Sequence, residues 1–179
     1  MSFSNEFLYD FKPVYEGILM AKDVKPERAV VEVIDEEQEG AGMFEPAGAL
    51  EVLEQIGDDV NTLTIYTDRA AYFREFAETM YEKNGLVSLI VSKKRLGLAK
   101  KTVGCSSIFL FDFEWNSAFY EKQIALGKHY IPIHKRAWRT AENLDIIVPF
   151  GYNTVIVKRP KKKTGTPWQD RFEKAFYRS

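Results

Sequence analysis

Cysteine and histidine are scarce in this chain, and long apolar runs are missing. The single cysteine, Cys105, cannot form a disulfide within the chain, so nothing indicates an oxidising compartment. No stretch approaches the roughly 18 consecutive apolar residues that a membrane-spanning helix needs. Residues Met1–Glu6 show no basic segment leading into an apolar run. We therefore expect no secretory signal, no membrane partner and a cytoplasmic protein.

Several sequence motifs of enzymes are also missing. The chain has no Walker A sequence, no G-x-S-x-G elbow and no C-x-x-C pair. His129 and His134 are five positions apart in a predicted strand, so they face opposite sides and cannot chelate one ion together. Cys105 precedes a predicted strand and is expected to be a small buried hydrophobe. No nucleophile–base pair can be nominated, which lowers the expectation of a hydrolytic enzyme.

Charge is distributed unevenly along the chain although the net charge is only −1. Residues 1–64 carry fifteen acidic and four basic side chains, whereas residues 158–179 carry two acidic and eight basic ones. Such asymmetry is typical of a face that binds anions or a partner, and it is equally compatible with two ends that neutralise each other in the fold. Both interpretations stay open.

Apolar runs alternate with segments of helical periodicity through the middle of the chain. The runs are rich in β-branched and aromatic residues, as in strands buried on both faces of a parallel sheet: Ala29–Ile34, Thr62–Thr67, Leu86–Val91 and Ser107–Phe111. The helical segments between them are Pro46–Ile56, Asp68–Lys83, the shorter Lys94–Val103 and Asn116–Leu126. This alternation predicts βαβ units and an α/β fold of three layers around a mostly parallel sheet.

Residues typical of helix ends agree with these boundaries. Gly57, Gly85 and Gly127 each follow a predicted helix, where a left-handed residue is expected. Asp68 and Asn116 stand at positions that favour N-caps.

The flanking segments complete one predicted domain over residues 1–179, with its core at residues 29–150. Phe7–Ala21 is interpreted as a leading strand or a packed arm. Further strands are predicted at His129–Ile133 and Asp145–Phe150, and Thr154–Lys158 closes a hairpin at the sheet edge. Residues 158–165 form a basic linker, and residues 167–177 form an amphipathic C-terminal helix that docks on the domain or on a second subunit.

Ligands of an open parallel sheet bind outside the carboxyl ends of its strands, so the segments after the strands are the candidate site. Gly40-Ala41-Gly42 follows the first strand and resembles the start of G-x-G-x-x-G, but Glu45 stands where the third glycine belongs. Four carboxylates in residues 35–39 would repel a phosphate. A flexible turn, a degenerate phosphate loop and a cation site made from these carboxylates all stay open.

Charged residues follow the other strands. Asp68 would hold ribose hydroxyls or cap the next helix, and Arg69 would accept a 2′-phosphate or lie in solvent. Ser92-Lys93-Lys94-Arg95 places cations at a helix start, which favours a nearby anion or a solvated face. Asp112-Phe113-Glu114 aims two carboxylates to one side of the fourth strand, as in metal-dependent phosphotransfer sites.

With the strand–helix order and Gly40-Ala41-Gly42 in place, residues 29–149 resemble a Rossmann-type NAD(P)-binding domain, of the kind found in shikimate dehydrogenase and glutamyl-tRNA reductase. The resemblance implies a sheet of order 3-2-1-4-5 and a crevice for NAD or NADP lined by Gly40, Gly42, Asp68 and Arg69. Because Glu45 replaces the third glycine and no separate substrate domain with a catalytic acid–base pair follows, it implies ligand binding more than hydride transfer.

Three functions are therefore predicted. The first is a Rossmann-like module that binds a small anion or nucleotide through the following residues: Gly40, Gly42, Asp68, Arg69, Ser92 and Lys93. The second is a homodimeric interaction protein that uses the C-terminal helix. The third is a metal-dependent phosphotransfer enzyme that uses Asp112 and Glu114. Nucleic acid is not an expected partner, because the basic tail is short and has no aromatic platform outside the C-terminal helix.

Overall fold

The computed structural model describes residues 11–36, 48–98, 107–114, 122–133, 145–150 and 153–158. The following predictions lie outside the described residues: the loop with Gly40 and Gly42, the helix start at Pro46, the N-cap at Asn116, Cys105, His134, the linker and the C-terminal helix.

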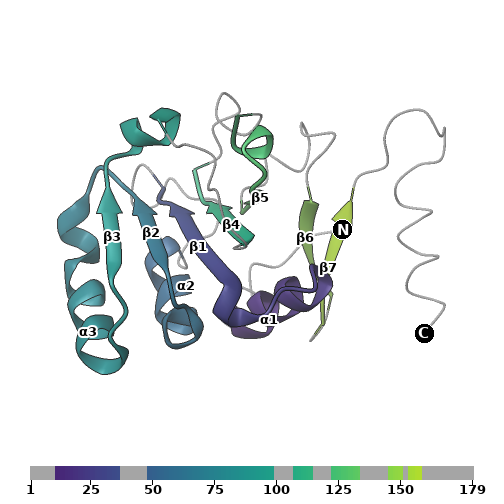
Figure 1. The fold of residues 1–179 in the computed structure, drawn as a ribbon, viewed down its shortest axis with the longest axis horizontal. Helices are drawn as coiled ribbons and strands as arrows, with labels where there is room; N and C mark the ends of the chain where they lie inside the picture. The colour runs from purple at the N-terminus through teal and green to yellow at the C-terminus, as the bar shows by residue number, and fades with distance from the viewer. Residues whose placement is uncertain are drawn as a thin grey trace.

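The core of the molecule is a five-stranded parallel sheet in the order β3-β2-β1-β4-β5, which confirms the predicted α/β fold and strand order (Figure 1). Its strands are β1 (Ala29–Ile34), β2 (Leu63–Tyr66), β3 (Ser88–Val91), β4 (Ser107–Asp112) and β5 (His129–Pro132). The order reverses between β1 and β4, where Ile34 is in register with Asp112. We call the side where the strands end the carboxyl edge.

The predicted hairpin is present as a sheet of its own. Strands β6 (Asp145–Phe150) and β7 (Asn153–Lys158) pair antiparallel. Figure 1 shows them beyond β5, and β6 packs next to β5 without joining its hydrogen-bonded ladder.

Three α-helices contribute to one hydrophobic core with one face of the sheet. They are α1 (Lys12–Ala21), α2 (Ala49–Ile56) and α3 (Arg74–Asn84), the last preceded by a 3-10 turn, η4 (Ala70–Phe73). Of the two alternatives for residues 7–21, the leading strand is wrong for the described part, because the segment packs on the core as a helix. Pro13 lies in the first turn of α1, and Val14, Ile18 and Leu19 form a buried helical stripe.

Two predicted caps are wrong, and two are confirmed. Gly85 and Gly127 have φ of +74° and +81°, in the left-handed region that glycine tolerates. Gly57 has φ −55°, and a Cβ there would lie 2.7 Å from Sδ of Met80, so the absence of a side chain permits the close approach of α2 and α3. Asp68 does not cap the helix after β2, because that segment begins at Ala70 with no side-chain cap.

Candidate functional site

The two faces of the sheet differ in chemistry: one is apolar, whereas the other combines buried apolar side chains (Ile34, Ile108 and Leu110) with buried ionisable ones. The face that packs on the three helices is apolar and is called the apolar face: Val31, Val33, Leu63, Ile65, Phe109, Phe111, Ile131 and Ile133. The other face holds buried ionisable side chains and is called the polar face: Glu32, Tyr66, Asp112, Lys128 and Tyr130. Side chains alternate along a strand, so every second residue of the same apolar runs reaches the polar face.

A buried ion pair crosses the polar face. Nζ of Lys128 lies 2.5 Å from Oε2 of Glu32, and the two residues are only 6% and 8% exposed. Lys128 precedes β5, so its side chain passes over β4 to reach β1. Burial and the neighbouring Glu32 carboxylate raise the pKa of Tyr66 to about 12. Taking the two charges out of water costs several kcal/mol each, which largely offsets their attraction. Fold stability alone therefore does not explain why this pair is buried here.

A second polar group lies where β4 and β5 end. The Tyr130 hydroxyl donates to Oδ2 of Asp112, while the backbone N–H of Glu114 donates to Oδ1 at 2.9 Å. Burial and the Asp112 carboxylate raise the pKa of Tyr130 far above its ordinary value. Tyr130 therefore stays a neutral donor, and Asp112 is held in place from two sides.

Replacing Tyr130 with phenylalanine tests this contact. We expect the free energy of unfolding to fall by about 1–3 kcal/mol, because a buried carboxylate loses a donor. Tyr15→Phe is the matched control: Tyr15 is equally buried, but its hydroxyl has no hydrogen-bond partner in the described part of the chain. Chemical denaturation of both variants gives the comparison, and equal losses would contradict the assigned role of the Tyr130 hydroxyl.

An ion pair spans the carboxyl edge. Nζ of Lys93, just after β3, lies 2.8 Å from Oε2 of Glu114, which follows β4. Strands β2 and β1 lie between β3 and β4 in the sheet, so this pair passes over the ends of both. Both side chains are largely shielded, at 12% and 23% exposure. Lys93 is therefore fixed over the point where the strand order reverses.

Asp68 and Ser92 hold together the turns after β2 and β3. Oδ1 of Asp68 accepts hydrogen bonds from the Ser92 hydroxyl at 2.7 Å and from the Lys93 backbone N–H at 3.3 Å. The Ser92 hydrogen bond, followed by the nearby Lys93 backbone and charge, lowers the pKa of Asp68. Its exposed carboxylate is thus an ionised acceptor at the carboxyl edge.

Arg69 lies on the same edge and is engaged with acidic residues. Its guanidinium donates to both carboxylate oxygens of fully buried Asp35, at 2.7 and 2.8 Å, and to Oε1 of Glu36 at 3.0 Å. The Thr67 hydroxyl donates to Asp35 at 2.8 Å, and Arg69 also packs over the Tyr72 ring at 4.2 Å. Arg69 is therefore part of a fixed network and does not extend into solvent.

Carboxylates occupy the start of α2, where a Rossmann pyrophosphate would lie. Oε2 of Glu36 accepts from the Ala49 backbone N–H at 3.2 Å, and Oε2 of Glu51 accepts from that of Gly48 at 2.8 Å. Burial, followed by the neighbouring Asp35 carboxylate, raises the pKa of Glu36. The described geometry offers no open phosphate position at this helix.

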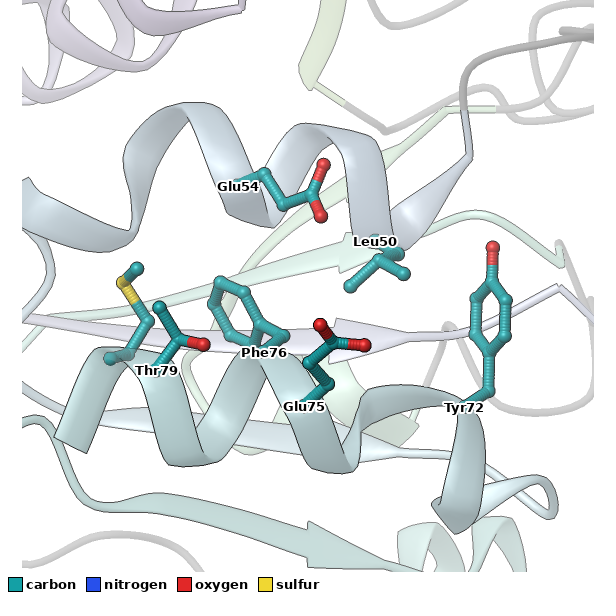
Figure 2. A pocket seen from close by; sticks show the side chains of 7 residues that line it. Leu50, Glu54, Tyr72, Glu75, Phe76 and Thr79 are labelled. Atoms are coloured by element: carbon teal, nitrogen blue, oxygen red, sulfur yellow. The ribbon is translucent and has the colours of Figure 1, made fainter. Parts of the chain in front are cut away.

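A groove of about 190 Å³ separates α2 from α3. Figure 2 shows Phe76 and Leu50 between the two helices, with the carboxylates of Glu54 and Glu75 around them. At one end lies Tyr72, the residue that packs against Arg69. The groove thus adjoins the carboxyl edge but opens on the helical layer and not on the polar face.

The structure places four of the six predicted ligand-binding residues at the carboxyl edge and brings three of them into contact. Asp68, Ser92 and Lys93 form one contact group, while Arg69 belongs to the Asp35 network at the same edge. Gly40 and Gly42 lie outside the described residues. Ligand binding by all six stays a prediction.

Sequence reasoning missed the buried polar side chains of the sheet. Three of them lie inside apolar runs: Glu32, Tyr66 and Tyr130. The sequence pattern that could have identified them is a polar residue at an alternate position of a strand that is expected to be buried. No local sequence pattern indicates that Lys128 belongs to this face, because its partner Glu32 is 96 positions away.

Metal-dependent phosphotransfer through Asp112 and Glu114 also stays a prediction. Both Asp112 oxygens accept hydrogen bonds, and Glu114 pairs with Lys93. The part of the chain that the structure describes has no group of three or more His, Cys, Asp or Glu residues arranged to hold a metal ion.

Comparison with known proteins does not assign the chain: no family model, curated protein or solved structure matches it. Among the described residues, no helix has the length and apolar character needed to cross a membrane.

Proposed function

We propose that this chain is a binding module for a small anionic ligand such as a nucleotide, held at the carboxyl edge on the side of the polar face. The observation that carries the proposal is the asymmetry of the sheet. A sheet with two apolar faces would also fold stably, yet the polar face of this sheet buries two polar groups. They are the ion pair of Glu32 with Lys128 and the Asp112 carboxylate with the Tyr130 hydroxyl. Buried groups with a shifted pKa, as the Tyr130 hydroxyl has, concentrate at functional sites.

Lys93 is the residue that we expect to hold the anion. An ammonium group has three donors, so Lys93 can keep its contact with Glu114 and donate to a phosphate oxygen as well. Its partner Glu114 follows β4, so the pair reaches from β3 toward the switch point between β1 and β4, where ligands of this fold class bind. Asp68, ionised and exposed nearby, is a suitable acceptor for ribose hydroxyls.

Thermal unfolding in the presence of NAD, NADP, S-adenosylmethionine, ATP and ADP tests the proposal. A ligand at about 100 times its Kd adds about 2.7 kcal/mol, which raises Tm by about 5–11 °C for a chain of this size. No shift with any of these compounds at millimolar concentration would remove the nucleotide proposal. The proposed function does not include hydride transfer. The cytoplasmic location of the protein stays a prediction.

Lys93→Met is expected to weaken binding of the nucleotide that gives the largest shift by about 10–100-fold, because one charge-assisted hydrogen bond is lost. Lys83→Met is the matched control, since Lys83 forms a similar pair with Asp58 at 2.6 Å but is exposed on α3. Isothermal titration calorimetry measures both affinities. Equal affinities in the two variants would exclude Lys93 as the anion-binding residue.

A further inference from the structure

The outer edge of β3 is an open strand edge with unusual chemistry. β3 is the terminal strand of the five-stranded sheet, and no described strand pairs with its outer side; Figure 1 shows helix α3 at the same end of the sheet. Half of its backbone N–H and C=O groups point away from β2 and can pair with another strand. An added extended strand satisfies such backbone groups directly, as in β-strand addition.

The residues of this edge lack the features that prevent pairing. The segment Leu86–Val91 contains no charged residue and no proline. Leu89 is 57% exposed and Val87 is 71% exposed, although both are large and apolar. Natural edge strands are usually protected by lysine, proline or a bulge, so an unprotected apolar edge indicates an interaction surface.

Charges at the two ends of β3 are complementary when the strand meets its own copy. The exposed acid Glu82 lies near the amino end of β3, and the exposed bases Lys94 and Arg95 follow its carboxyl end. Lys83, also near the amino end, is already paired with Asp58. An antiparallel pair of β3 strands would bring the acidic end of each copy beside the basic end of the other.

We infer that two copies of this chain pair through antiparallel β3 strands and form one continuous ten-stranded sheet across a two-fold axis. A two-fold contact uses the same patch on both copies, which is what a self-complementary strand provides. The four-residue strand β3 is small beside the roughly 800 Å² per partner of a standard interface, so we expect micromolar association. This surface is distinct from the C-terminal helix and from the proposed ligand site.

Light scattering and sedimentation equilibrium on the full chain, from about 1 μM to about 1 mM, test the inference at the affinity expected for a small interface. We expect a concentration-dependent dimer, and Leu89→Lys should weaken it on the order of 100-fold, because each copy loses an apolar contact and gains a like charge. Met20→Lys is the control, since Met20 is another exposed apolar residue, at 80%, on α1.

A wild-type chain that stays monomeric over this range would overturn the inference, and so would a dimer that persists in Leu89→Lys. Val87→Lys is a second variant at a more exposed position, in case the first fails to fold. Trp168 and Phe172 are apolar residues of the predicted C-terminal helix, and replacing both with alanine tests the alternative. We expect the dimer to stay intact; loss of the dimer would assign association to the C-terminal helix instead.

Discussion

Replacing Glu32 with leucine, or Lys128 with methionine, is expected to lower the free energy of unfolding by about 3–5 kcal/mol. Each change leaves one charge buried without its partner, in a place where the two residues are 8% and 6% exposed. For a chain of this size the loss corresponds to a fall in Tm of about 6–20 °C. Denaturant unfolding of each single variant measures it.

The double variant, Glu32→Leu with Lys128→Met, gives the sharper result. Apolar residues of similar volume in place of a buried pair are often neutral or stabilising by about 1–4 kcal/mol, so we expect the double variant to recover wild-type stability or exceed it. A double variant as unstable as the two single changes combined would show that the pair is required for folding. That result would remove the main argument for a functional polar face.

Replacing Arg69 with methionine is expected to cost about 3–5 kcal/mol as well, because fully buried Asp35 then keeps only the Thr67 hydroxyl as a described side-chain partner. The change also removes the cation that faces Glu36 and the contact with the Tyr72 ring.

Arg74→Met is the matched control, since Arg74 is exposed at the start of α3 and forms no ion pair within the described residues. We expect this control to stay within about 0.5 kcal/mol of wild type. Thermal unfolding of both variants in one buffer gives the comparison. A loss below about 1 kcal/mol for Arg69→Met would mean that water reaches Asp35 and that the network is not rigid.

Local sequence patterns identified most of the sheet because its strands are short apolar runs with clear ends. Ala29–Ile34 was predicted with the bounds that the structure has, and the other core strands differ by one or two residues at their ends. The strand order came from the family resemblance and not from any local pattern, since which strands pair depends on contacts between distant segments.

The interpretation of single residues was less successful because one sequence signature serves several structures. Asp68 has the position of an N-cap, yet its carboxylate binds Ser92, 24 positions away. Gly57 has the position of a left-handed residue, yet Met80 of another helix explains it. Partners this far apart in sequence leave no local pattern, so the polar face became visible only in the fold.

Backbone amide NMR of the full chain during titration with ATP or NAD tests the ligand site most directly. We predict chemical-shift changes at Asp68, Lys93 and Glu114, around the switch point between β1 and β4. Changes confined to the helical groove around Leu50 and Glu75, or none at millimolar nucleotide, would contradict a nucleotide site on the polar face.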